Sequence, residues 1–356
     1  MNSLVYLLLV TFSFDFLTFT PPMVSEFQKS PYHAIAVPVV SAYDTGRIPS
    51  IEDLRAQITQ FTTLTTKHIW PWIFLNRMVG TNLAEKNAHA QVPYFLGIKG
   101  ADLDNSTGAQ NDFFQVWRVG LQAAKALGSP GVVFDPEFYN DYAAYKIPEL
   151  ARQTGKTPDE VMQLLRGVGA HMADIAQEEL PGAKILIFFT GLGRPGWYTE
   201  GPASYYLSSA YVAMGLLERI KQSGYRLTVI SGGEVGLGYC HSSLEQMQMK
   251  IDNRFKASLP FLDDYAGILV LGGTTTLWLD EAHKTGYFTQ GYCGKCPAHN
   301  VEELQPYLEK LFRNYGYAWI WASGGGGYLA FDPQVTPRFN TTLARALDAT
   351  GRASKK

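Results

Sequence analysis

Hydrophobic and polar positions follow two alternating patterns along the chain. Short apolar runs, rich in β-branched and aromatic residues and bounded by Gly, Pro or polar residues, predict eight strands. These are residues 33–41, 68–76, 93–100, 131–137, 184–190, 226–232, 266–273 and 317–323. Longer amphipathic segments predict eight helices, over residues 50–65, 81–90, 110–128, 157–180, 205–223, 244–258, 301–315 and 336–350.

Local signals mark several of the predicted helix ends. Thr157-Pro-Asp-Glu160 places Pro at the first helical position and Glu at the third, which is typical of a capped helix start. Gly128 and Gly224 stand where a helix is expected to stop. Eight strands alternating with eight helices predict an α/β protein, a (β/α)8 TIM barrel in a single domain. An open doubly wound sheet is the alternative, but no GxGxxG follows the first predicted strand.

The first 25 residues are assigned outside the barrel, which is predicted over residues 26–356. The apolar stretch from Leu4 to Leu17 contains Asp15 and is shorter than the roughly 20 residues of a membrane-spanning helix. It predicts a secretory signal peptide, with an N-terminal extension packed on the barrel as the alternative. The sequons at Asn105 and Asn340 are compatible with export. We therefore expect a secreted protein whose mature chain does not span a membrane.

The composition and net charge limit the classes of ligand that this protein is expected to bind. The net charge is −2 and no long basic run occurs, which argues against nucleic acid as a partner. The chain has 7 Trp and 20 Tyr, a supply of flat surfaces for a core or for sugar rings. Cys293 and Cys296 form a CxxC that favours a structural role over zinc binding with Cys240, and the 7 His include no HxH. We predict no metal and no cofactor.

The sharpest candidate site is the end of the fourth predicted strand, because active sites of this fold lie at the C-terminal ends of strands. Side chains alternate across a strand, so Val133, Asp135 and Glu137 share the inward face. Two neighbouring carboxylates raise the pKa of one of them, which suits a general acid. The alternative is a scaffold role, with Asp135 capping a turn and Glu137 paired to a cation.

Polar and aromatic side chains near the other predicted strand ends form a candidate sugar-binding set. A loop Trp offers an apolar plate to a sugar ring and an N–H to its hydroxyls. Trp70, Trp72 and Trp319 are expected in the core instead, because they lie deeper along their strands. The candidate substrate-binding residues are Asn76, Asp102, Tyr139, Trp197, Tyr239, Trp278, Asp280 and Trp321.

The segment from Gly131 to Tyr139, GVVFDPEFY, resembles the D-x-E ending of strand 4 in chitinase-like and hyaluronidase-like glycoside hydrolases. The resemblance implies that Glu137 is the general acid and that Asp135 orients the N-acetyl group of the substrate, whose oxygen attacks the anomeric carbon. It also implies that Trp321 forms the floor of the sugar site. Val133 and Gly131 stand where the chitinase pattern has two further acids.

Three other interpretations stay open. Glu234, after the sixth predicted strand, can flank a glycosidic bond as nucleophile or base, at about 5–5.5 Å from the acid for retention or about 6.5–9.5 Å for inversion. The barrel can also bind carbohydrate without catalysis. Gly272-Gly273 and Gly324–Gly327, after the seventh and eighth strands, can cradle the phosphate of a phosphosugar. The sequence favours a glycoside hydrolase acting on an oligo- or polysaccharide.

Overall fold

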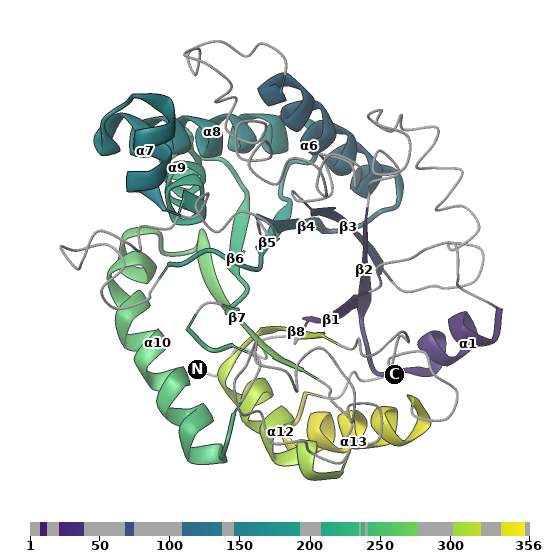
Figure 1. Ribbon diagram of the computed structural model, residues 1–356. Coiled ribbons are helices and arrows are strands. Elements are labelled where there is room, and N and C mark those ends of the chain that lie inside the picture. The colour runs from purple at the N-terminus through teal and green to yellow at the C-terminus, as the bar shows by residue number, and fades with distance from the viewer. Residues whose placement is uncertain are drawn as a thin grey trace.

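The computed structural model describes residues 8–12, 21–38, 68–74, 109–136, 146–192, 208–234, 236–238, 241–276, 302–321 and 336–352. These residues form a closed barrel of parallel strands in which each strand pairs with its neighbours in sequence order and β1 pairs with β8 (Figure 1). The predicted (β/α)8 barrel is confirmed. The strands are β1 Leu8–Phe12, β2 Ala34–Pro38, β3 His68–Phe74, β4 Gly131–Asp135, β5 Lys184–Ile187, β6 Thr228–Ser231, β7 Leu269–Thr276 and β8 Tyr317–Trp321.

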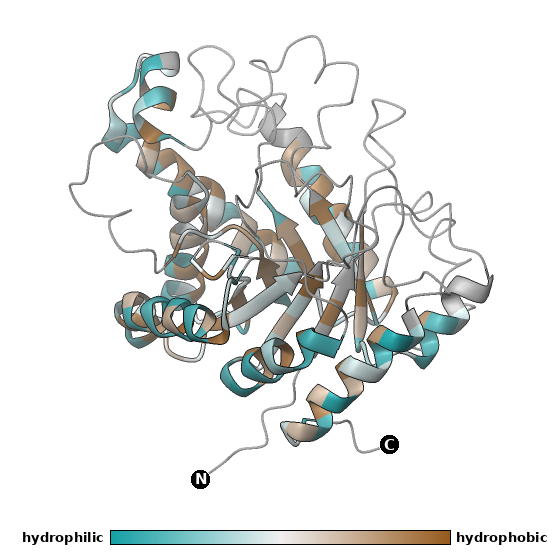
Figure 2. Ribbon diagram, turned by 60° about the horizontal axis from the view of Figure 1, so that its bottom comes forward, coloured by the Kyte–Doolittle hydropathy of each residue, from teal (hydrophilic) through white to brown (hydrophobic). Residues whose placement is uncertain are grey.

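Helices surround the barrel (Figure 1). They are α1 Pro21–Lys29, α6 Ala109–Ala126, α7 Ile147–Thr154, α8 Pro158–Glu179, α9 Ser208–Ser223, α10 Leu244–Asp264, α12 Gln305–Asn314 and α13 Thr336–Ala349, with a 3-10 turn at Glu302–Leu304. Six of them match predicted helices, whereas α1 and α7 were not predicted. The helices predicted over 50–65 and 81–90 lie outside the described residues. The helices carry both hydrophobic and hydrophilic residues, as helices packed on a barrel do (Figure 2).

The first barrel strand comes from the segment that the sequence analysis had placed outside the barrel. Val10 of β1 pairs with Ala34 of β2 and with Trp319 of β8, and its side chain is only 1% exposed. The barrel therefore starts before residue 26, which corrects the boundary, and the strand predicted first, 33–41, is the second. A short continuous apolar run fits both a leader and a strand buried on both faces, so the pattern could not separate them. The strand predicted at 93–100 lies outside the described residues.

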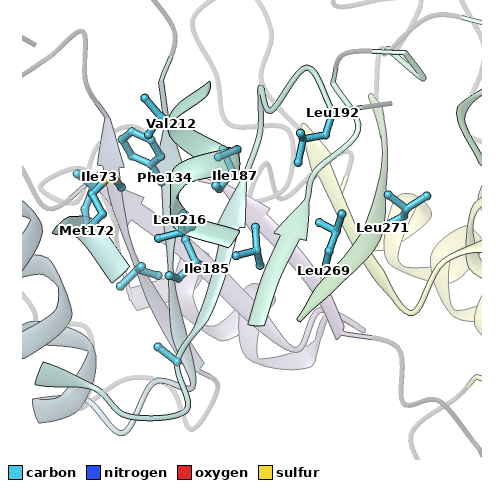
Figure 3. Packing of buried hydrophobic residues seen from close by; sticks show 14 of the residues in the cluster. Ile73, Phe134, Met172, Ile185, Ile187, Leu192, Val212, Leu216, Leu269 and Leu271 are labelled. Carbon is cyan, nitrogen blue, oxygen red and sulfur yellow. The ribbon is translucent and has the colours of Figure 1, made fainter. Parts of the chain in front are cut away.

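The strand side chains divide into an interior and an outer layer, as the alternation predicts. The interior is filled by Val10, Ala34, Ala36, Trp70, Trp72, Val133, Leu186, Phe188, Ile230 and Trp319. Trp319 stacks on Phe188 with ring centroids 4.2 Å apart, and Phe188 also contacts Trp72. The three tryptophans expected in the core are all buried. In the outer layer, strand residues such as Phe134 and Ile185 face Met172 of α8 and Leu216 of α9 (Figure 3).

The start of α8 is capped as its sequence predicts. The Thr157 hydroxyl accepts a hydrogen bond from the Glu160 backbone N–H, and the Glu160 carboxylate accepts one from the Thr157 N–H at 2.7 Å. This backbone hydrogen bond lowers the pKa of Glu160. The contribution of Glu160 to stability is therefore complete above its ordinary pKa and is lost as the pH falls through the lowered one.

We expect Thr157→Ala to lower the free energy of unfolding by about 1 kcal/mol at neutral pH, because the cap leaves backbone donors unsatisfied when it is lost. The difference from wild type should shrink in acid, since protonation of Glu160 weakens the same cap in the parent. Thermal unfolding of both proteins at about pH 7 and about pH 3 measures this. A difference that grows in acid would contradict the assignment.

Two features bear on export. None of the described helices is long and apolar enough to cross a membrane. The sequon at Asn340 lies inside α13, and its Thr342 is buried. Since a glycosylation acceptor is expected on a surface loop, Asn340 fits that role poorly. The sequon at Asn105 lies outside the described residues.

Candidate active site at the C-terminal mouth of the barrel

Asp135 is the last residue of β4, where it pairs with Phe74 of β3. Val133 lies in the interior cluster, and Val132 and Phe134 lie in the outer cluster. Alternation therefore places Asp135 on the inward face, as predicted, and it is only 1% exposed. A carboxyl group buried at the mouth of a barrel costs desolvation free energy, so it calls for hydrogen-bond partners or a chemical use.

Glu234 lies on the turn that follows β6, at the same end of the barrel. The Gly232 N–H donates to the Ile187 carbonyl at 2.7 Å, which carries the ladder one residue beyond the strand. The Trp319 indole N–H donates to the Gly232 carbonyl at 2.8 Å from inside the barrel. The Glu234 side chain is half-buried. The structure thus brings Asp135 and Glu234 to one mouth, with β5 between the strands that precede them.

Hydroxyl groups line the ends of the neighbouring strands. Thr190, after β5, and Ser231, at the end of β6, are both buried, and their hydroxyl oxygens are 2.7 Å apart. Thr274 of β7 is fully buried, and its hydroxyl forms no hydrogen bond within the described part of the chain. Buried polar atoms are normally hydrogen-bonded, which sets this hydroxyl apart from those of Thr190 and Ser231.

Sequence reasoning missed Arg254 of α10, which is 2% exposed. Its guanidinium donates to the carbonyl of Gly272 and to the carbonyl of Ser231. The signal was present in the sequence: Met247, Ile251 and Ser258 lie on the buried side of α10, and Arg254 falls at the helical spacing between them. A charged residue within the buried stripe of a helix indicates a specific partner.

Of the predicted site residues, the structure describes Asp135, Glu234 and Trp321. Trp321 ends β8 and pairs with Thr276, so its backbone lies at the mouth. The other predicted site residues lie outside the described residues: Glu137, Asn76, Asp102, Tyr139, Trp197, Tyr239, Trp278 and Asp280. The same holds for Cys240, Cys293 and Cys296. Among the residues that are described, no three His, Cys, Asp or Glu side chains gather as a metal site would require.

One predicted loop is not a loop. Gly272 and Gly273 were expected to follow the seventh strand and to cradle an anion, but both lie within β7. A Cβ on Gly272 would meet Ile230 at 3.0 Å, and one on Gly273 would meet Tyr315 at 2.3 Å. Close packing against the interior and against α12 therefore explains the two glycines, and the phosphate cradle at this position is wrong. Gly324–Gly327 lie outside the described residues.

The chain matches no family model and no curated protein. Solved structures do resemble it. A GH5-4 broad-specificity endoglucanase from Clostridium longisporum has a TM-score of 0.54 at 9% identity, and the alignment covers 94% of this chain and 87% of the endoglucanase.

Two further barrels are similar. A tri-modular GH5 subfamily 4 endo-β-1,4-glucanase from Bacillus licheniformis has a TM-score of 0.52 at 9% identity, with 98% of this chain and 60% of that chain covered. A GH5 lichenase from Caldicellulosiruptor sp. F32, in complex with cellotetraose, has a TM-score of 0.50 at 10% identity, with 92% and 84% covered. These likenesses show a shared barrel fold.

Proposed function

We propose that this chain is a glycoside hydrolase, with Glu137 as the general acid and Asp135 and Glu234 as its partners. The observation that carries the proposal is the placement of two carboxylates, the buried Asp135 and the half-buried Glu234, at the C-terminal mouth of one barrel. Active sites of this fold lie at that mouth. The similar barrels described above are named as glycan-cleaving enzymes, which supports the same class of reaction here.

The chemistry follows from the environment of strand β4. Asp135 is almost fully buried, and Glu137 follows it by two residues on the same predicted face. In our proposal the two carboxyl groups lie close together, which would disfavour ionisation of both and keep one protonated. Glu137 would then donate its proton to the leaving oxygen of the glycosidic bond. Asp135 would hold Glu137 or a substrate hydroxyl in place.

The second partner is Glu234 in our proposal. As a carboxylate it would attack the anomeric carbon or activate a water, depending on its distance from the acid. Two of the similar barrels are named as glucanases and a third as a lichenase, which supports a glucan substrate and hence an enzyme carboxylate in this role. Attack by an N-acetyl group of the substrate, implied by the chitinase-like segment, is the alternative for an amino-sugar polymer.

The rest of the predicted site belongs to the same proposal. The sugar would contact the predicted substrate-binding side chains, which are Asn76, Asp102, Tyr139, Trp197, Tyr239, Trp278, Asp280 and Trp321. Export to a polymeric substrate also stays a proposal. Its first basis, the apolar N-terminal segment, supplies β1 in the structure, so export now rests on the nature of the substrate and on the sequon at Asn105.

A glycan panel tests the proposal. We expect the wild-type chain to release reducing ends from at least one of cellotetraose, mixed-linkage β-glucan, xyloglucan and chito-oligosaccharides. Asp135→Asn should lower kcat by about 100-fold, because it loosens the orientation of the reacting groups. The exposed Asp252→Asn on α10 is the matched control and should retain full activity. Tight glycan binding without turnover would favour the non-catalytic barrel instead.

A further inference from the structure

Arg254 is a buried cation that no step of the proposed reaction uses. It reaches from α10 to the end of β6 and the middle of β7, where one guanidinium nitrogen donates to the Ser231 carbonyl at 2.7 Å and to the Ser231 hydroxyl at 3.3 Å. The other terminal nitrogen donates to the Gly272 carbonyl. The guanidinium also lies 5.3 Å from the ring centre of Tyr315. The side chain therefore ties two neighbouring strands together just below the turn that carries Glu234.

The turn itself is shaped around this guanidinium. Gly233 has a φ of 92°, a conformation that favours glycine, and a Cβ on it would lie 2.7 Å from an Arg254 nitrogen. From the other side, Trp319 in the barrel interior donates to the Gly232 carbonyl. The Gly232-Gly233 pair is thus held between Trp319 inside the barrel and Arg254 outside it, and Glu234 is the next residue.

The hydrogen bonds of Arg254 extend to the segment after a third strand. The Ser231 hydroxyl that accepts from Arg254 is 2.7 Å from the Thr190 hydroxyl, and Thr190 accepts from the Leu192 N–H at 3.4 Å. The end of β6, the segment after β5 and the middle of β7 thus share one network with the guanidinium at its centre. A planar fork with several donors can make these contacts together, which an ammonium group cannot.

Stability alone explains this arrangement poorly. Within the described residues, Arg254 donates to two carbonyls and a hydroxyl, so among these residues its charge is compensated by dipoles. Burying a cation in this way carries a desolvation cost that an apolar side chain of similar volume avoids. What the fork adds is a fixed geometry for the turn.

We propose that Arg254 is a positioning residue, which fixes the turn at Gly232-Gly233 so that the Glu234 carboxylate faces the reacting bond. The inference rests on the role proposed above for Glu234. Arg254 contacts no substrate. It acts through the backbone of the turn, in the way that supporting groups hold a catalytic side chain within a narrow range of positions.

The test compares Arg254→Lys with Ile251→Ala, in the full chain. Lysine keeps the charge but has a single donor nitrogen in place of the planar fork, whereas Ile251→Ala loosens α10 from a fully buried position without removing a hydrogen bond to the turn. Two properties are measured below the unfolding temperature of each variant. They are hydrogen exchange of the segment 232–238, and kcat and KM on the best glycan of the panel.

We expect Arg254→Lys to speed exchange in 232–238 by about tenfold and to lower kcat by about 100-fold with little change in KM. Ile251→Ala should lower the unfolding temperature but leave both properties near wild type. Unchanged exchange in Arg254→Lys, or equal effects in the two variants, would overturn the proposal. If wild type cleaves no glycan, the glycosidase proposal fails and the positioning role falls with it. Faster exchange in Arg254→Lys would then support only the anchoring of the turn by Arg254.

Discussion

Glu137→Gln is expected to lower kcat for glycan hydrolysis by about 10²- to 10⁴-fold, because glutamine cannot donate the proton that the leaving oxygen needs. The change keeps the size and shape of the side chain, so the unfolding temperature should stay close to that of wild type. Reducing-end release and thermal unfolding, measured on the same preparation, separate lost chemistry from lost folding.

The control is Glu178→Gln, which makes the same chemical change on the exposed end of α8, where Glu178 pairs with Arg118. This variant should be as active as wild type. Glu234→Gln should match Glu137→Gln in the size of its loss, and the double variant should lose little more than either single one, because residues that act as a unit are not additive. Full activity in Glu137→Gln would remove the general acid from the proposal.

Val10→Asp is expected to abolish stable folding at neutral pH. Val10 is 1% exposed within the apolar interior, beside a cavity of about 10 Å³ that Trp70, Leu186, Ile230 and Trp319 help to line. A carboxylate there has too little space for more than one water, and the desolvation cost of an unpaired charge is several kcal/mol. Denaturant unfolding followed by circular dichroism measures the loss.

The milder Val10→Ala serves as the control, with an expected cost of about 2 kcal/mol from the lost apolar contacts. Acid should partly rescue Val10→Asp, since a protonated carboxyl is less costly to bury than a charged one. Mass spectrometry of the purified wild-type chain should find residues 8–12 retained. A fully stable Val10→Asp variant, or a folded chain that lacks this segment, would show that β1 is not needed to close the barrel.

The sequence predicted the barrel because its signals are local and repeated. Seven of the strands in the barrel overlap predicted ones, and the inward placement of Asp135 followed from alternation alone. The strand that was not predicted, Leu8–Phe12, is a short apolar run without a polar face. Only its pairing with β2 and β8 identifies it as a strand of the barrel. The end of β7 was placed too early because two glycines suggested a turn, whereas close packing against Tyr315 requires a small residue there.

The candidate site was predictable only in part. The places of Asp135 at the end of β4 and of Glu234 after β6 could be predicted, because both follow from the order of the strands. Arg254 could not be assigned a role, since its acceptors are the carbonyls of Ser231 and Gly272, and only the packing of α10 against β6 and β7 brings them together. Every residue has a backbone carbonyl, whatever its side chain. The sequence therefore does not indicate which carbonyls accept the hydrogen bonds of Arg254.

The pairing of β1 with β8 has a consequence for the way this protein folds. Leu8 pairs with Tyr317, so the first strand of the barrel must wait until the eighth has been made before the barrel can close. Until then both edges of the unfinished sheet, with apolar side chains on both faces, are open to other chains. Contacts between distant parts of a chain form slowly. Until β1 and β8 pair, the chain is therefore exposed to aggregation through these open edges.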